Sequence, residues 1–408
     1  MKPTLNDYIP IVGDGVVDEL RHLGQRLKGK RVVNINSTRV GGGVAEILVR
    51  LVPLLAEIGL NVRWEVIKGT EEFFTLTKKL HNALHGAQIA FAPADHEIYD
   101  EVTRDNLKLL DLDADVVFIH DPQPVGLVRA REEHRGSWIW RCHVDVSAPF
   151  PGSWEFLEPF VARYDMSVFS APQFARQLEI PQALISPSID PLSDKNRELT
   201  QEEIESVLTR LGLRSDKPMV TQISRFDRLK DPLGVLEAWR NAKRYNESQL
   251  ILAGGAAPDD PESVQVLKEV REHAGDDPDV HVLDLPPTSN IEINALQRAS
   301  TVVLQKSLKE GFGLTVSEAL WKSKPVIAGA VGGIPLQITH KYSGILTHTV
   351  EGTAFWIKQL LSTPDFARRL GENGHAHIRN NFLLTRHLRD YLLAFLYLMS
   401  ERQDVVKL

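Results

Sequence analysis

Short runs of β-branched and other apolar residues alternate along the whole chain with longer amphipathic segments. This alternation is typical of parallel sheets whose strands are joined by crossover helices. In the first half the runs predict five strands, at residues 31–37, 62–69, 115–121, 138–145 and 166–172. In the second half they predict five more, at residues 218–224, 249–255, 280–285, 301–307 and 325–331. Because the same pattern occurs twice, we expect an α/β protein with two Rossmann-like, doubly wound domains.

The predicted boundary between the domains lies in residues 183–200, where prolines and turn-forming residues interrupt any periodicity. The chain has 408 residues, which exceeds the size at which a single core stops growing. We therefore predict a first domain at 1–187, a hinge near Pro187 to Pro191, and a second domain at 188–385. Residues 386–399 form a strongly amphipathic segment, so we expect a C-terminal helix within 386–408 that packs back on the first domain.

Composition and charge restrict the class of partner. The formal net charge is −7, so a general attraction to nucleic acid or to an anionic membrane is not expected. The single cysteine, Cys142, has no partner for an internal disulfide, and no Cys/His cluster has zinc spacing. No apolar run is long enough for a signal peptide or a membrane span. These features predict a cytoplasmic protein that needs no metal or other cofactor.

A triple glycine, residues 41–43, follows the first predicted strand and opens an apparent helix. Glycine amides at a helix N-terminus can bind an anion, although a plain tight turn explains the same residues. Gly41 and Gly43 fit the first two positions of a dinucleotide-binding fingerprint, but the third position is Glu46. A nicotinamide-dependent dehydrogenase is therefore disfavoured.

Two stretches of the second half combine charge with glycine at predicted strand ends. Arg225 and Lys230 follow the strand at 218–224, where a guanidinium and an ammonium suit a diphosphate; two solvated surface cations are the alternative. The second stretch follows the strand at 301–307 and contains Glu310, Gly311, Phe312, Gly313, Leu314, Thr315 and Glu318. Its glycines would bring the backbone close to a ligand at the N-terminus of a helix that we expect to start near Leu314. Its two carboxylates would accept hydrogen bonds from sugar or ribose hydroxyls.

Polar residues also gather at two strand ends in the first half. His120, Asp121 and Gln123 follow one strand, and His143 and Asp145 end another. Such a group could line a polyhydroxylated pocket or transfer protons, although a satisfied core histidine is an alternative for His120. Asp113 and Asp115 form a D-x-D pair, but they precede a strand and so lie at the wrong end of the sheet for a metal site.

These motifs, in this order, resemble the retaining glycosyltransferases of the two-Rossmann (GT-B) type. The resemblance rests on Arg225 with Lys230, on Glu310-Gly-Phe-Gly and Glu318, and on the segment AVGGIP at 330–335. The first-half segments NSTRVGGGVAEIL, VFIHDPQP, WRCHVDVSAP and PSIDPLS are similar to those of trehalose glycosyltransferring synthases. The resemblance implies two domains facing across a cleft, an acceptor side in 1–187 and a nucleotide-sugar donor side in 188–385.

The resemblance also implies roles for the residues. Arg225 and Lys230 would bind the donor diphosphate and stabilise it as it leaves. Glu310 and the turn from Gly311 to Thr315 would hold the donor sugar, and Glu318 would hold the ribose. His143 would lie beside the donor glucose, and Gly42 and Gly43 would contact phosphate or acceptor. Asp121, Gln123 and His143 would contact the acceptor.

The expected reaction joins glucose from ADP-glucose or UDP-glucose to free glucose to form trehalose, with retention of the anomeric configuration. Retention through a carboxylate nucleophile and front-face transfer both remain open. The first-half motifs are shared in part with trehalose phosphorylases, and QITHKYSGIL at 337–346 departs from the acidic turn of many relatives. A phosphorylase and a non-catalytic sugar-nucleotide sensor therefore remain alternatives, and the resemblance leaves a homodimer open.

Overall fold

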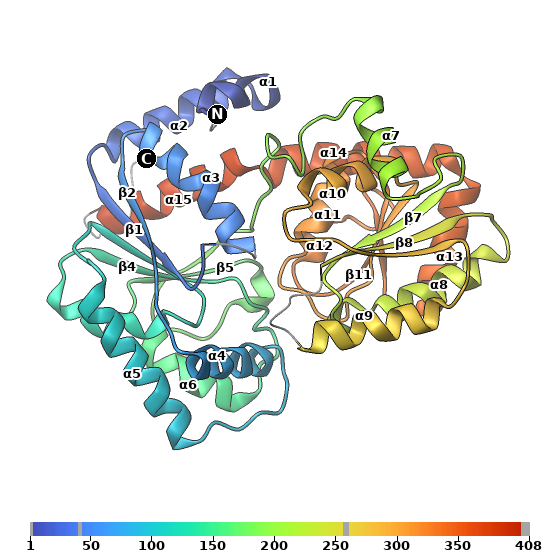
Figure 1. Cartoon of the computed structure of the whole chain (residues 1–408). Coiled ribbons are helices and arrows are strands. Elements are labelled where there is room, and N and C mark those ends of the chain that lie inside the picture. The colour runs from blue at the N-terminus through green and yellow to red at the C-terminus, as the bar shows by residue number, and fades with distance from the viewer. Residues whose placement is uncertain (1–2, 40–42, 256–260, 401–408) are drawn as a thin grey trace. The chain divides into compact units, whose positions relative to one another are not determined.

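The computed structural model describes residues 3–39, 43–255 and 261–400, and within them the chain divides into two compact units. The first unit comprises Met1–Pro187 and Leu384–Leu408, and the second comprises Ser188–Leu383. Each unit has one six-stranded parallel sheet with helices on both faces (Figure 1). The predicted α/β class with two doubly wound sheets is confirmed.

The sheet of the first unit has the strand order β2-β1-β3-β4-β5-β6. Its strands are β1 (Arg31–Asn36), β2 (Asn61–Val66), β3 (Val116–His120), β4 (Ser137–Cys142), β5 (Met166–Phe169) and β6 (Gln182–Leu184). Because β2 and β3 pair with opposite edges of β1, the sheet has its topological switch point between β1 and β3. Ligands of open parallel sheets bind at such a point, outside the carboxyl ends of the strands.

Helices cover both faces of this sheet because its central strands are apolar on both sides. All five residues of β3 are buried. The helical elements of the first unit are η1 (Leu5–Tyr8), α1 (Ile9–Val12), α2 (Asp14–Arg26), α3 (Gly43–Glu57), α4 (Glu71–Leu84), α5 (Pro93–Leu109), η2 (Val125–Glu133), α6 (Pro151–Val161), η3 (Pro172–Phe174) and α15 (Leu384–Met399). Helix α15 packs with α2 and α3, and α4 packs with α5 and α6 (Figure 1).

The C-terminal helix α15 joins the core of the first unit although it follows the whole second unit in sequence. Its apolar stripe brings Tyr391 to Phe118 of β3, with ring centroids 4.8 Å apart, and Phe395 to the same ring at 5.9 Å. Arg386 donates hydrogen bonds to the carbonyl oxygens of Ser186 and Pro187 at 2.8 and 3.1 Å. The helix is therefore held at the sheet and at the end of the unit's first segment.

The second sheet has the order β12-β11-β10-β7-β8-β9, with its switch point between β7 and β10. Its strands are β7 (Met219–Ile223), β8 (Gln249–Gly254), β9 (Val280–Asp284), β10 (Val302–Gln305), β11 (Val326–Gly329) and β12 (Ile345–Thr347). Its helical elements are α7 (Gln201–Arg210), η4 (Arg228–Lys230), α8 (Pro232–Lys243), α9 (Pro261–Ala274), α10 (Asn290–Ala299), α11 (Leu314–Trp321), α12 (Ile334–Gln337), α13 (Val350–Ser362) and α14 (Pro364–Asn381). Helices α8 and α13 pack together over a core that includes Trp239, Val302 and Ile357.

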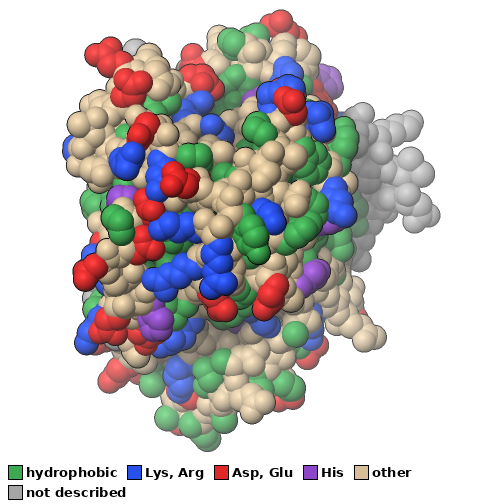
Figure 2. All heavy atoms as spheres, turned by 90° about the vertical axis from the view of Figure 1, so that its right-hand side faces the viewer, with side chains coloured by type: hydrophobic (Ala, Val, Ile, Leu, Met, Phe, Trp, Pro, Cys, Tyr) green, Lys and Arg blue, Asp and Glu red, His purple; other side chains and the backbone are tan. Residues whose placement is uncertain are grey.

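All ten predicted strands are present, and two further strands, β6 and β12, were not predicted. Each has only three residues and lies at a sheet edge, and Leu184 of β6 is 51% exposed. A segment of three residues is too short to show a strand's alternation of buried and exposed positions. Among the described residues, no helix is both long and apolar enough to cross a membrane. On the face shown in Figure 2, acidic and basic side chains are intermixed over the second unit.

Candidate active site

The switch point of the second sheet brings together the two charged stretches that the sequence predicts as a donor site. The loop after β7 carries Arg225 and Lys230, and the loop after β10 carries Glu310. Main-chain contact joins the loops, because the amide of Leu308 donates to the carbonyl of Leu229 at 2.8 Å. Residues 80 positions apart in the sequence thus become direct neighbours.

Lys230 and Glu310 form an ion pair at the centre of this edge. The Nζ atom of Lys230 lies 2.6 Å from Oε2 of Glu310, and the two side chains are 16% and 11% exposed. Ser307 and Gln305 also donate to Oε2 of Glu310, at 3.0 and 3.3 Å. Burial raises the pKa of Glu310, but the charge and hydrogen bond of Lys230, together with the other two donors, outweigh it and hold the pKa below its usual value. Glu310 is therefore an anion that accepts hydrogen bonds.

The turn between Glu310 and α11 exposes main-chain groups beside this carboxylate. Gly313 is the N-cap of α11 with a left-handed φ of 80°, and it has no side chain that could cap the helix. Leu314 and Thr315, partly exposed, begin the helix where the sequence predicted it. Phe312 is buried, and its carbonyl accepts a hydrogen bond from Nε2 of Gln337 at 2.6 Å. The amides of the first turn can therefore meet an anion.

The segment AVGGIP at 330–335 packs against the turn that follows Glu310. The amide of Gly333 donates to the carbonyl of Gly311 at 3.0 Å. Gly332 has a φ of +53°, and a Cβ atom placed there would lie 1.6 Å from the carbonyl oxygen of Glu310. Only glycine fits such an approach, so this segment fixes the backbone that carries Glu310.

Replacing Gly332 by alanine should displace the Glu310 turn. The variant should unfold at a lower temperature, and any activity of this site should fall at least tenfold. Gly212 offers a matched control, since it also has a left-handed φ, +68°, but nothing lies within 4 Å of the added Cβ. The Gly212→Ala variant should lose only the roughly 1–2 kcal/mol of the left-handed conformation and keep its activity. The measurements are thermal unfolding and initial rates, and equal losses in the two variants would contradict the supporting role.

Glu318, the second predicted carboxylate, lies on α11 and is 5% exposed. Its Oε1 lies 3.8 Å from Nζ of Lys195, and its Oε2 accepts a hydrogen bond from Gln297 at 3.3 Å. One helical turn on, the ammonium of buried Lys322 donates to Asn196 at 3.0 Å and to the carbonyl of Glu318 at 3.1 Å. Burial lowers the pKa of Lys322 to about 7. Sequence reasoning missed Lys195 in a loop and Gln297 on α10 (Asn290–Ala299), which belong to no motif, and Lys322, which caps the C-terminus of α11.

Arg225 differs from Lys230 in that it faces solvent. Its side chain is 55% exposed, and Nη2 lies 3.5 Å from Oδ2 of Asp227. Asp227 in turn accepts the amide of Leu229 at 2.7 Å and so shapes the loop. The structure therefore leaves the Arg225 side chain open to solvent, whereas the Lys230 ammonium is paired with Glu310.

At the switch point of the first unit, the ends of β1, β3 and β4 bring together a polar group that includes Asp121 and His143. Asp121 has a left-handed φ of 69°, and its Oδ1 accepts the main-chain N–H of His143 at 2.8 Å. The Nδ1 atom of His120 lies 3.2 Å from Nε2 of His143, and Nε2 of His120 lies 3.2 Å from Oδ1 of Asn34. Asn34, on β1, was not among the predicted site residues.

The direction of hydrogen bonding along this chain follows from the asparagine oxygen, which can only accept. His120 must then carry its proton on Nε2 and accept at Nδ1, so the donor to Nδ1 is Nε2–H of His143. Burial lowers the pKa of His120 to about 3, with a smaller effect of the charge of Arg141. The pKa of His143 is lowered well below its usual value by burial, Arg141 and His120. Both rings are neutral at physiological pH, and Nδ1 of partly exposed His143 is left with a lone pair.

Asp121 is the acidic member of this group. Burial raises its pKa to about 6, against the hydrogen bond from His143 and the charge of Arg141. A raised carboxyl pKa means that the folded state binds the proton more tightly than the unfolded chain. Stability therefore falls as the pH rises from about 4 to about 6 and stays lower above that range, by at most about 3 kcal/mol.

The Asp121→Asn variant should remove this penalty. Asparagine tolerates the left-handed backbone, and its Oδ1 still accepts the His143 amide. We expect the variant to be at least as stable as the wild type at pH 8 and to lose that advantage at pH 4.5, while transferase activity falls. Urea unfolding at the two pH values measures the difference. A variant that is destabilised equally at both would show that the charge of Asp121 does not weaken the fold.

Other predicted residues of the first unit have simpler surroundings. Gly43 begins α3 after β1, whereas Gly42 lies outside the described residues. The main-chain oxygen of Gln123 accepts the hydroxyl of Tyr99 at 3.0 Å. Asp113 pairs with Arg31 at 2.7 Å and Asp115 with Lys30 at 3.4 Å, at the amino ends of β1 and β3. Within the described ranges no group of three or more His, Cys, Asp or Glu residues is placed to hold a metal ion.

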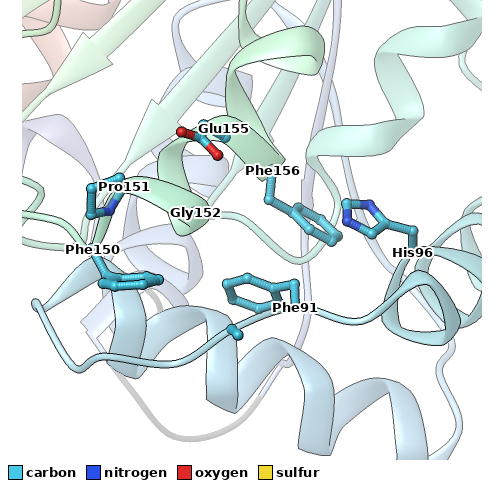
Figure 3. A pocket seen from close by; sticks show the side chains of 8 residues that line it. Phe91, His96, Phe150, Pro151, Gly152, Glu155 and Phe156 are labelled. Atoms are coloured by element: carbon cyan, nitrogen blue, oxygen red, sulfur yellow. The ribbon is translucent and has the colours of Figure 1, made fainter.

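A pocket of about 420 Å³ opens elsewhere on the first unit, where the loops before α5 and α6 meet (Figure 3). Phe91, Phe150 and Phe156 line it together with His96 and Glu155. The ring of Phe156 stacks on His96 with centroids 4.4 Å apart and lies 5.4 Å from Phe91. The pocket therefore lies at the edge of an aromatic cluster. None of the predicted site residues lines it.

Two protein families match the chain. Residues 34–176 match the family described as "Trehalose synthase, N-terminal domain", and residues 204–377 match "Glycosyl transferases group 1". Together with the two doubly wound sheets and the charged groups at their switch points, these matches define a glycosyltransferase of the GT-B type.

Individual relatives narrow the class. A trehalose synthase from Rubrobacter xylanophilus is 44% identical over 406 residues, which cover 97% of each chain. A trehalose phosphorylase from Pleurotus pulmonarius is 27% identical over 98% of this chain but only 61% of its own. The solved structure of a UDP-forming α,α-trehalose-phosphate synthase from Burkholderia xenovorans shares the fold, with a TM-score of 0.71 at 15% identity over 90% of this chain and 98% of that one. The chain belongs to the trehalose synthase family.

Proposed function

We propose that this enzyme transfers glucose from a nucleoside diphosphate glucose, ADP-glucose or UDP-glucose, to free glucose and forms trehalose with retention of the anomeric configuration. The observation that carries the proposal is the Lys230–Glu310 pair at the switch point of the second sheet, beside the N-terminus of α11. In this proposal the Lys230 ammonium binds phosphate, and the Glu310 carboxylate and the main-chain amides of the adjacent turn bind the hydroxyls and the anion of the donor. Membership of the trehalose synthase family supports the choice of product.

On the donor side, Lys230 turns from Glu310 toward the diphosphate, and exposed Arg225 adds a second positive charge. As the bond between the anomeric carbon and the phosphate oxygen breaks, negative charge develops on that oxygen, and both cations stabilise it. Glu310 accepts hydrogen bonds from the sugar hydroxyls, and the turn from Gly311 to Thr315 supplies amides. Glu318 binds the ribose hydroxyls, with Lys195 beside its carboxylate at 3.8 Å.

On the acceptor side, Asp121 and His143 accept hydrogen bonds from the hydroxyls of glucose. Nδ1 of His143 and the second oxygen of Asp121 are suited to this because both are acceptors. Gln123 and the amides near Gly42 and Gly43 complete this side of the site. The acceptor oxygen forms the new bond to the anomeric carbon, and its proton passes to the departing phosphate on the same face of the sugar, which retains the configuration.

The test is to incubate the purified protein with UDP-glucose or ADP-glucose and free glucose, and to follow nucleoside diphosphate and non-reducing disaccharide together. Equal amounts of both products, with an α,α linkage by proton NMR, are the expected result. Donor binding without product would instead make the protein a sugar-nucleotide sensor. Trehalose cleavage that requires inorganic phosphate and no nucleoside diphosphate would make it a phosphorylase.

A further inference from the structure

One fully buried charge of the first unit has no assigned task. Arg141 lies on β4, its residue is 0% exposed, and it faces the layer that contains α15. Its Nη2 lies 3.4 Å from Oγ of Ser170, which is a weak hydrogen bond. Among the described residues, no protein group accepts a hydrogen bond from its Nε or Nη1.

A buried guanidinium without a carboxylate partner weakens a fold. Replacing such a charge by an apolar side chain of similar size is often neutral or stabilising. Elsewhere in this unit a partly buried arginine is paired: Arg131 holds Asp165 through two hydrogen bonds of 3.0 Å. The presence of an unpaired buried guanidinium at Arg141 therefore needs an explanation other than the stability of the fold.

The surroundings of Arg141 supply that reason, because its neighbours are the groups of the candidate acceptor site. In the parallel register Arg141 is opposite His120, and its carbonyl accepts the amide of Asp121 at 2.8 Å. Three elements carry the titratable and charged groups around Arg141. His120 ends β3 and Asp121 follows it, and Cys142 ends β4 and His143 follows it. Helix α15 carries Arg386, His387, Asp390 and Tyr391.

The charge of Arg141 shifts the pKa of three members of this group in the same direction. It lowers the pKa of His120, of His143 and of Asp121. Burial has the larger effect on all three groups: it also lowers the pKa of the two histidines, but it raises the pKa of Asp121. Arg386 cannot supply the same effect unopposed, because it is paired with Asp390 at 2.8 Å. A permanent positive charge behind the strands thus favours neutral imidazoles and an ionised carboxylate.

We propose that Arg141 is a positioning residue of the acceptor site, which keeps His143 and Asp121 in the forms that accept hydrogen bonds from substrate hydroxyls. The inference rests on the proposed function for the identity of that substrate, a sugar. Arg141 itself does not touch the sugar.

The test compares Arg141→Met, Arg141→Lys and Arg131→Met. In the pH profile of kcat/KM, the acid limb of Arg141→Met should move upward by about 0.5–1 pH unit, since His143 and Asp121 both become easier to protonate. Arg141→Lys should restore the limb, and Arg131→Met should lose stability without moving it. An unmoved limb in a folded Arg141→Met protein, or a limb that moves as far in Arg141→Lys, would overturn the proposal.

A second measurement needs no activity. In wild-type protein labelled with ¹⁵N-histidine, the ring nitrogens of His120 and His143, assigned with His120→Gln and His143→Gln, should report neutral rings from about pH 8 to pH 5.5. Rings that become charged near pH 6.5 would overturn the proposal. Because no substrate is present, this result stands apart from success or failure of the transfer assay.

Discussion

Replacing Glu310 by alanine is expected to lower kcat/KM for transfer by about 10²–10³, while the affinity for free nucleoside diphosphate stays the same or rises. The loss follows because the carboxylate would hold the sugar in the transition state, and removing one such preorganised contact costs about 10²–10³ in rate. Affinity for the nucleotide is retained because the change frees Lys230, whose ammonium lies 2.6 Å from the Glu310 carboxylate. Initial rates and calorimetric titration with UDP and ADP measure the two quantities.

Asp279 provides the control for Glu310. It forms an ion pair of 2.5 Å with Lys217 at similar exposure, but next to the amino ends of β7 and β9, away from the predicted ligand edge. The Asp279→Asn variant should lose stability and keep its transfer rate. Near-normal transfer by Glu310→Ala, with the fold intact, would remove Glu310 from the reaction.

Replacing Lys230 by methionine is expected to weaken nucleoside diphosphate binding at least tenfold and to lower kcat/KM by about 10²–10³, because the ammonium would contact the diphosphate both when bound and when leaving. The variant also leaves Glu310 without its cation. Burial then raises the pKa of Glu310 with less opposition, so the variant should lose more stability at pH 8 than at pH 5.

Lys217→Met is the matched change for this second experiment, since Lys217 precedes β7 whereas Lys230 follows it, and their side chains are 14% and 16% exposed. It should affect stability alone. UDP affinity within twofold of wild type in Lys230→Met would contradict a role of Lys230 at the phosphates.

The sequence predicted the fold well because each buried strand of a parallel sheet can be recognised from its own local sequence. A strand buried on both faces, such as Val116–His120, is a continuous apolar run that stands out from its neighbours. The start of α11 at Leu314 was also predictable, because Gly313 breaks the chain's regular conformation just before it. The edge strands β6 and β12 left no such trace, since three residues cannot show a period.

The candidate site was predictable in its members but not in their pairing. Lys230 and Glu310 each follow a strand, which indicates a shared edge, yet nothing local shows that they bind each other across 80 positions. Lys195 and Gln297 approach Glu318 from a loop and a helix that carry no motif. Arg141 did leave a signal, an arginine inside an apolar strand, but its charged and titratable neighbours on α15 lie some 240 positions further along.

The return of α15 to the first unit has a consequence for the order in which the protein is made. Residues 1–187 are translated before residues 188–383, yet the helix that packs on Phe118 is translated after them. The second unit can therefore complete its own core during synthesis, while the earlier-made unit waits with an apolar sheet face uncovered. The first unit therefore completes its core only after α15 has been translated, so a product that ends before Leu384 should leave that face of its first sheet exposed to solvent.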